Sequence, residues 1–256
     1  MEIIKKTINT VFGLNDVKNR KIKGGPLDGM FYCGNYSDGR YFSGFENNIV
    51  KKIKQNIKNG NIYDIGGHFG FYALLFSTLL KEGNVYSFEP NPYCFKILNQ
   101  NIKINNLEGK VKTFNFGLGK EEKIVEMMII LGNMARSTCD DDSKRLYEEK
   151  KKNFETKDVI IKRLDDLNLP APGFIKIDVE GMELDVIEGC YETIKKNRPE
   201  IIIEIHESQR KNLHSPIKKL VQILSNLGYF CFSIDENRSV TENIPLTGHL
   251  YFSTKE

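Results

Sequence analysis

"NIYDIGGHFGFYALLFSTLLKEGNVYSFEP", residues 61–90, contains the clearest evidence for the fold of this chain. Its first β-rich run, 61–66, indicates a buried strand, and the segment 71–83 is typical of a helix that Gly83 closes. A second strand is expected at 84–90. The glycines between the first strand and the helix permit backbone angles and a close ligand approach that a side chain would block. This stretch therefore predicts a β-α-β unit with a ligand-binding turn.

The alternation of strands and helices continues along the chain. We expect helices at 92–106, 182–197 and 215–228, and strands at 110–119, 173–181, 199–207, 229–235 and 249–255. Connections this short predict a parallel, doubly wound α/β sheet. No helix is expected between the last two strands, so we predict that they form an antiparallel pair at one edge of the sheet.

Two segments depart from this alternation. Residues 1–60 contain the piece "KGGPLDGMFYCGNYSDGRYFSG", whose turn residues and aromatics suggest a small β-layer leading into a helix. Residues 132–157 are highly charged and predict either a surface excursion or a lid over the substrate. We expect an N-terminal cap at 1–60 packed on one main domain at 61–256.

Composition narrows the class of protein. The 256 residues include 37 Lys and Arg against 34 Asp and Glu, and this near-balance argues against nucleic acid as a partner. The five cysteines lie far apart without a CxxC pair, which predicts a reduced, cytoplasmic protein. The longest apolar stretch, 69–80, is shorter than the roughly 20 residues of a membrane span, so no transmembrane segment is expected. The amphipathic start of the chain leaves weak attachment to a membrane complex open.

Ligands of open parallel sheets bind beyond the carboxyl ends of the strands, and the sequence places many polar or glycine residues there. In strand order these residues are Asp64, Gly66, Gly67, His68 and Gly70; Glu89 and Pro90; Asn115; Asp178 and Glu180; and Glu204 and His206. Glu89 comes about twenty residues after the glycine turn, where a carboxylate can accept hydrogen bonds from both hydroxyls of a ribose. A nicotinamide cofactor and S-adenosylmethionine both satisfy these conditions.

The second half of the chain favours the methyl donor. "DIGGHFGFYA" (64–73), "VYSFEPNP" (85–92), the N-x-x-x-N spacing in "LNQNIKINN" (98–106) and "FIKIDVEGMELDVIEG" (174–189) followed by "RPEIIIEIHE" (198–207) resemble the FkbM-type family of S-adenosylmethionine-dependent methyltransferases. The likeness covers about residues 25–207 and includes "YFSGFENNIV" (41–50), which is similar to that family's G-x-[YF]-E motif. It implies the Rossmann-like class I methyltransferase fold, a seven-stranded mostly parallel sheet in the order 3-2-1-4-5-7-6 with an antiparallel edge strand, and S-adenosylmethionine as the cofactor.

The first motif departs from the family pattern. The family usually has D-[VI]-G-A-N-x-G, so Gly67 and His68 stand in place of Ala and Asn. We expect Gly67 to be tolerated, whereas His68 leaves the usual contact near the methionine moiety open. "NPY" (91–93) follows the second strand and not the fourth, which argues against an amino-group acceptor and for an oxygen acceptor. We assign cofactor binding to Asp64, Gly66, Gly67, His68, Gly70, Glu89, Pro90, Asn115 and Asp178.

Methyl transfer to a hydroxyl is an in-line displacement in which the acceptor loses a proton. We expect Asp178 to face the transfer site, with Glu180 either assisting it or capping the next helix. Glu204 and His206 alternate on one strand and share a face, and His206 is the second candidate for the general base. No His/Cys cluster suggests zinc and no metal site is predicted, although Mg²⁺ held by Asp178 and Glu204 stays open as an alternative.

The resemblance implies O-methylation of a hydroxyl on a sugar, polysaccharide or secondary metabolite, with a small-molecule or glycan acceptor as partner. We expect selectivity to arise in the N-terminal layer and in residues 132–157; homo-oligomerisation is compatible with the sequence. Two alternatives are a nicotinamide-dependent Rossmann oxidoreductase and a non-catalytic member that binds a cofactor or glycan within a biosynthetic complex.

Overall fold

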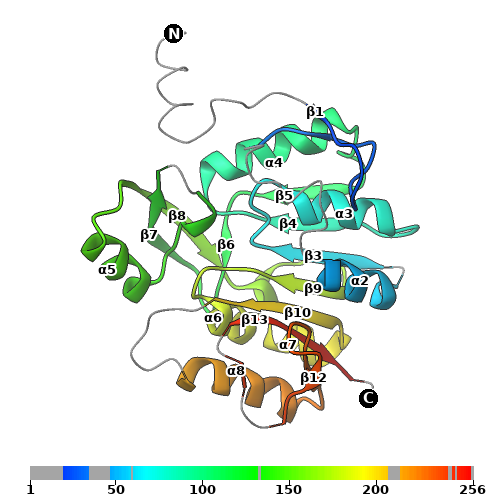
Figure 1. The fold of residues 1–256 in the computed structure, drawn as a ribbon. Helices are drawn as coiled ribbons and strands as arrows, with labels where there is room; N and C mark the ends of the chain where they lie inside the picture. Colours follow the sequence, from blue (N-terminus) through cyan, green and yellow to red (C-terminus); the bar gives the residue numbers. More distant parts are fainter. Residues whose placement is uncertain are drawn as a thin grey trace.

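The computed structural model describes residues 20–34, 47–58, 60–131, 134–206, 214–241, 244–245 and 247–254. Within these ranges the central sheet has eight strands in the order β12-β11-β13-β10-β9-β3-β4-β5 (Figure 1). Their bounds are β3 Asn61–Ile65, β4 Val85–Phe88, β5 Val111–Phe114, β9 Pro172–Ile177, β10 Glu200–Ile205, β11 Phe230–Ser233, β12 Arg238–Ser239 and β13 Gly248–Ser253.

The strand order confirms the predicted class I methyltransferase topology. Counted from the first sheet strand of the main domain, β5-β4-β3-β9-β10-β13-β11 is the order 3-2-1-4-5-7-6. Neighbouring strands from β5 through β10 are parallel, and β13 runs antiparallel to both β10 and β11. The last two predicted strands do pair with each other, and the two-residue strand β12 adds an antiparallel edge beside β11.

Helices cover the sheet on both faces, as expected where parallel strands are buried on both sides. One apolar core contains residues of α2 (Asn47–Asn56), α3 (Phe71–Leu79) and α4 (Pro92–Ile104). The other core contains residues of α6 (Glu183–Gly189), α7 (Tyr191–Asn197) and α8 (His214–Asn226). The predicted helix 182–197 is thus two helices that meet at Cys190. Among the helices that the structure describes, none combines the length and the apolar character that crossing a bilayer requires.

A second sheet, in the order β6-β8-β7, lies beside the carboxyl ends of the central strands (Figure 1). It consists of β6 (Gly117–Leu118), β7 (Lys123–Ile130) and β8 (Phe154–Lys162), and β7 is antiparallel to β8. The predicted strand 110–119 is therefore divided between two sheets. The charged segment 132–157 contains the 3₁₀ helix Met134–Arg136 and α5 (Asp141–Glu149), and Asp140 caps α5 by accepting a hydrogen bond from the Ser143 backbone N–H.

The described part of residues 1–60 contains a short hairpin, β1 (Arg20–Lys21) with β2 (Phe31–Tyr32), followed by α2. Two asparagines, Asn101 in α4 and Asn105 at its C-cap, hold the hairpin by pairing with its backbone: Asn101 with both backbone groups of Cys33, and Asn105 with both backbone groups of Phe31. These are the residues of the N-x-x-x-N spacing, one helical turn apart. Residues 35–46, which include most of the quoted G-x-[YF]-E segment, lie outside the described residues.

Candidate active site

The glycine turn between β3 and α3 is packed against the end of β9. Gly66 has a φ of 86°, and a Cβ at this position would lie 1.8 Å from the carbonyl oxygen of Asp178. The backbone N–H groups of Gly66 and Gly67 both donate to the Phe88 carbonyl at 3.0 Å. Position 66 therefore requires glycine, because any side chain there would overlap the backbone at the end of β9. This contact brings the predicted cofactor turn and the predicted catalytic strand end together.

Gly67 is explained by the side chain opposite it. A Cβ at Gly67 would lie 2.2 Å from the Ser87 Oγ. The Ser87 hydroxyl donates a 2.9 Å hydrogen bond to the Asp64 Oδ2, and both residues are fully buried. Glycine replaces the family's alanine here because Ser87 fills the space that a methyl group would occupy. The sequence offered no signal for this pairing, because Ser87 reads as an ordinary strand residue.

Glu89 closes the turn from the end of β4. Its Oε2 accepts a 2.7 Å hydrogen bond from the His68 backbone N–H, and its Oε1 accepts one of 2.8 Å from the Asn91 N–H. Burial raises the pKa of Glu89 to about 7, although these two hydrogen bonds favour the ionised form. Each oxygen retains a lone pair, so the carboxylate can accept further hydrogen bonds from a bound ligand.

His68 occupies a left-handed backbone conformation, with a φ of 46°. Asparagine and histidine are both enriched at such positions, so the exchange of the family's Asn for His preserves the turn. The imidazole is stacked on the Phe69 ring, with 3.9 Å between centroids and 19° between planes. The backbone of His68 thus contributes to the site through Glu89, and its ring packs along the turn.

Asn115 and Pro90 support the backbone next to Glu89. The Asn115 Nδ2 donates to the Glu89 carbonyl at 2.9 Å and to the Pro90 carbonyl at 3.2 Å. The Pro90 ring lies against Gly117, where a Cβ would come within 3.4 Å of it. Both residues lie beside the predicted ribose acid and fix its backbone.

A buried lysine separates two predicted site acids. The Lys176 Nζ lies 2.8 Å from the Asp178 Oδ2, and the side chain is only 3% exposed. On the neighbouring strand Asp64 is in register with Lys176. Burial alone would raise the pKa of Asp178, but Lys176 and then His206 lower it to about 2. Our sequence interpretation missed Lys176, although its alternation with Asp178 in "KID" already placed both side chains on one face.

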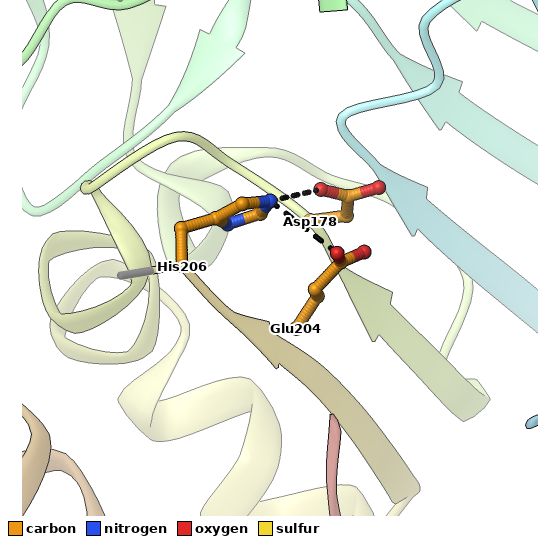
Figure 2. Close-up of side chains that lie close together, drawn as sticks. All are labelled: Asp178, Glu204 and His206. Atoms are coloured by element: carbon orange, nitrogen blue, oxygen red, sulfur yellow. Dashed lines mark ion pairs between the residues drawn. The ribbon is translucent and has the colours of Figure 1, made fainter. Parts of the chain in front are cut away.

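Carboxylates surround His206 at the end of β10 (Figure 2). Its Nε2 lies 3.5 Å from the Asp178 Oδ1, 3.6 Å from the Glu180 Oε1 and 3.5 Å from the Glu204 Oε1. Its Nδ1 lies 3.3 Å from the Glu183 Oε1. The structure therefore brings all four residues predicted to be catalytic into one cluster. Glu180 does not cap α6, whose N-cap is Met182.

Charge within the cluster shifts the pKa values of its members. Burial alone would lower the pKa of His206, but the hydrogen bond to Glu183 and the charges of the surrounding carboxylates raise it to about 10. Burial raises the pKa of Glu180 to about 7. At this pKa, and with no ion bound to its ring, His206 is an imidazolium at neutral pH and donates protons rather than accepting them.

A further acid–base pair extends the cluster toward β13. The Glu204 Oε2 lies 3.3 Å from the His249 Nε2, and the His249 Nδ1 lies 3.2 Å from the Asp235 Oδ2. Our sequence interpretation did not include His249, because a lone histidine on a terminal strand gives no signal until the antiparallel pairing Glu204–His249 is known.

The charged segment reaches the same strand end. The Thr138 Oγ1 donates to the Glu180 carbonyl at 2.8 Å, and a Cβ at Gly181 would lie 3.0 Å from the Asp140 Cβ. The segment between β7 and β8 is thus attached to the turn after β9 and forms part of the surroundings of the cluster.

This fold is that of a class I methyltransferase. The methyltransferase FkbM domain matches residues 64–231, more than half of the chain. The chain belongs to the FkbM methyltransferase family.

Relatives with a curated description agree with this assignment. The methyltransferase sdnD of Sordaria araneosa is 27% identical over 174 residues, which cover 58% of this chain and 67% of that protein. The hexuronic acid methyltransferase AglP of Haloferax volcanii is 25% identical over 164 residues, which cover 63% of this chain and 62% of that protein. The chain thus spans about two thirds of the length of these relatives.

Solved structures match this chain at low sequence identity. A provisionally assigned rRNA methylase from Clostridium thermocellum has a TM-score of 0.51 at 9% identity and covers 80% of this chain and 92% of its own. A methyltransferase FkbM from Methylobacillus flagellatus KT has a TM-score of 0.48 at 17% identity and covers 77% of this chain and 44% of its own.

Proposed function

We propose that this chain transfers the methyl group of S-adenosylmethionine to a hydroxyl oxygen of a sugar, polysaccharide or secondary metabolite. The observation that carries the proposal is the contact between the two halves of the site. The glycine turn, closed by Glu89, lies on the Asp178 carbonyl, and the Asp178 side chain faces His206. A donor held at the turn and an acceptor held at the cluster are therefore neighbours, as an in-line displacement requires.

The residues of the turn fit the cofactor. Glu89 has lone pairs available for the two hydroxyls of a ribose. In the described part of the chain, the Asp64 Oδ1 is fully buried and has no hydrogen-bond partner, which suits it to an ammonium such as that of a methionine moiety. When bound, S-adenosylmethionine supplies a methyl group on a sulfonium, which a nucleophile displaces.

The cluster provides groups for the acceptor hydroxyl. Asp178 is oriented by Lys176, so its Oδ1 is fixed toward His206 and can accept the hydrogen bond of a hydroxyl. Glu180, 3.6 Å from the His206 Nε2, is the neighbouring carboxylate and a second acceptor for the proton. We assign His206 and Glu204 to orienting the acceptor through their contacts with these carboxylates.

A relative and the polar residues of the site support this choice of acceptor class. AglP is described as a hexuronic acid methyltransferase, and a sugar acid presents several oxygens to a polar site. We place acceptor recognition at the segment between β7 and β8, because Thr138 and Asp140 contact the turn that carries Glu180. A cytoplasmic enzyme acting on a small-molecule or glycan acceptor agrees with this proposal.

Ligand binding separates this proposal from its alternatives. We expect S-adenosylhomocysteine, but not NAD, to raise the Tm of the full chain, and Glu89→Ala to remove the shift. Asp178→Asn should retain S-adenosylhomocysteine binding and lose methyl transfer in a screen of glycans with labelled donor. Glu188→Gln, which changes a pair with Lys219 on the helix surface, serves as the control that leaves both unchanged. Stabilisation by NAD alone would contradict the proposal and support the oxidoreductase.

A further inference from the structure

The atoms that face one another in the cluster at the ends of β9 and β10 are arranged as ligands of a cation. The Asp178, Glu204 and His206 side chains each direct one ligand atom inward, and these three atoms lie within 4.8 Å of one another (Figure 2). The distances from the His206 Nε2 to the Asp178 Oδ1 and the Glu204 Oε1 are both 3.5 Å. Metal–ligand distances of about 2.1–2.3 Å place adjacent ligand atoms of an octahedron about 3.0–3.3 Å apart and opposite atoms up to about 4.6 Å apart. The cluster needs only a small contraction to reach this spacing.

Hydrogen bonding does not account for this spacing. A single Nε2–H can donate well to one acceptor, yet three carboxylate oxygens lie at 3.5–3.6 Å from this nitrogen. Hydrogen bonds to a charged nitrogen are usually about 2.7–2.9 Å long. The Nε2 is therefore nearly equidistant from three acceptors and close to none, and this spacing leaves room for an ion between the Nε2 and the Asp178 and Glu204 oxygens.

The outer atom of each inward-facing group is held by another side chain. Lys176 lies 2.8 Å from the Asp178 Oδ2, and His249 lies 3.3 Å from the Glu204 Oε2. The Glu183 Oε1 lies 3.3 Å from the His206 Nδ1, which fixes the proton on that nitrogen and leaves Nε2 as the ligand atom. Groups that orient metal ligands in this way are the usual outer partners of metal sites. Here all three candidate ligands have one.

We propose that Asp178, Glu204 and His206 bind one divalent cation. Two carboxylate oxygens and one imidazole nitrogen form a mixed hard and borderline set, which suits Mn²⁺ best among the common hexacoordinate ions. Four carboxylates, including Glu180 and Glu183, converge on this place, and the cation offsets their repulsion. Three protein ligands leave positions on the ion for water and for oxygens of an acceptor.

The role of the ion rests on the proposed function, whereas its binding site does not. An acceptor hydroxyl bound to the cation becomes more acidic. Glu180, which is not one of the three ligands, receives the hydroxyl proton. The electron pair of the oxygen forms the new bond to the methyl carbon, and the pair of the breaking C–S bond remains on sulfur. A cation at Asp178 thus holds the acceptor oxygen beside the glycine turn.

Binding of Mn²⁺ tests the site without any acceptor. The full chain, stripped with EDTA, is titrated with MnCl₂, and free Mn²⁺ is followed by electron paramagnetic resonance. We expect one saturable site per chain, lost in Glu204→Gln and in His206→Asn, and unchanged in the control Glu188→Gln. Glu183→Gln, which removes only the outer partner of His206, should weaken binding about 10–100-fold. Mg²⁺ and Zn²⁺ in competition establish the preference, and Mn²⁺ bound more weakly than Mg²⁺ would overturn the choice of ion.

Two results overturn the site itself: the absence of saturable binding in the unmodified chain, or equal binding in folded Glu204→Gln and His206→Asn. Thermal unfolding and S-adenosylhomocysteine binding of the same EDTA-treated samples establish that each variant is folded. They also separate the two proposals. If S-adenosylhomocysteine binds and Mn²⁺ does not, the cation proposal fails and the proposed function stands. If Mn²⁺ binds and S-adenosylhomocysteine does not, the proposed function fails and the cation proposal stands.

Discussion

Asn101 in α4 and Asn105 at its C-cap provide a matched test of what holds the N-terminal hairpin to the core. The Asn101 amide makes hydrogen bonds of 2.6 and 2.8 Å with the N–H and carbonyl of Cys33, and a third of 2.7 Å with the Phe69 carbonyl. The Asn105 amide pairs with the N–H and carbonyl of Phe31 at 2.8 and 2.7 Å. The two residues thus make equivalent pairs with the hairpin and differ in burial.

Burial determines the expected cost of each substitution. Asn101 and Cys33 are fully buried, so Asn101→Ala leaves one N–H and two carbonyl groups without partners. At roughly 1–3 kcal/mol for each unpaired buried group, and less for carbonyls that retain some polar contact, we expect a loss of about 3–5 kcal/mol in the free energy of unfolding. Phe31 is 42% exposed, so water replaces the lost partner in Asn105→Ala, and we expect a cost of about 1 kcal/mol or less.

Urea unfolding of the two variants measures this difference. Asn101 lies inside α4, where Ala also gains about 0.5 kcal/mol of helix propensity, whereas Asn105 is the C-cap, so this gain reduces the expected cost of Asn101→Ala only. The slope of unfolding free energy against urea should stay unchanged, because the folded structure buries the same surface. Asn101→Ala should also weaken S-adenosylhomocysteine binding, because Asn101 holds the Phe69 carbonyl of the glycine turn. A difference of less than about 1 kcal/mol between the variants would refute the assignment of the cost to buried unpaired groups.

Three further predictions concern the site. Gly67→Ala should destabilise the chain by roughly 1–3 kcal/mol, because the new methyl group overlaps the Ser87 Oγ. Adding Ser87→Ala to this variant should recover part of the loss, and additive costs of the two substitutions in a double-mutant cycle would disprove the overlap. Lys176→Met should cost roughly 3–5 kcal/mol in urea unfolding, because it removes the closest cation, 2.8 Å away, from the partly buried Asp178 carboxylate, and a cost below about 1 kcal/mol would argue against that pair. Because burial raises the pKa of Glu89 to about 7, its carboxyl is protonated below that pH and loses an ionised acceptor for the ribose hydroxyls. The affinity for S-adenosylhomocysteine should therefore fall as the pH drops through about 7, with proton release on binding in calorimetry, and a flat profile between pH values of about 8 and 6 would contradict this role.

The central sheet could be predicted because its signals are local. Each buried strand is an apolar run that ends in a polar residue, and each connecting helix has its own apolar face. The glycine turn was identifiable for the same reason, although what its glycines avoid was not. Gly66 avoids the Asp178 carbonyl, which lies more than a hundred residues away in the chain, and that neighbour is fixed only by the pairing of β3 with β9.

The second sheet could not be predicted in the same way. β7 and β8 pair across the charged segment that contains α5; much of β8 is exposed, and the apolar run of β7 is confined to Met127–Ile130. Their stability depends on partners distant in the sequence, which periodicity does not reveal. For the same reason the sequence could not predict that His249 lies beside the cluster. Its contact with Glu204 exists only because β13 inserts between β10 and β11.

Lys176 joins the two halves of the site electrostatically. It lies 2.8 Å from Asp178 and in register with Asp64, and its pKa is raised because these two acids outweigh the effect of burial. An ammonium bound at the Asp64 Oδ1 would offset part of the negative charge of Asp64, so that Lys176 would interact mainly with Asp178. A cation bound at Asp178 would offset the charge of Asp178, so that Lys176 would interact mainly with Asp64. In the two proposals taken together, each bound cation shifts Lys176 toward the other acid and so disfavours binding there, and this coupling is reciprocal by thermodynamic necessity.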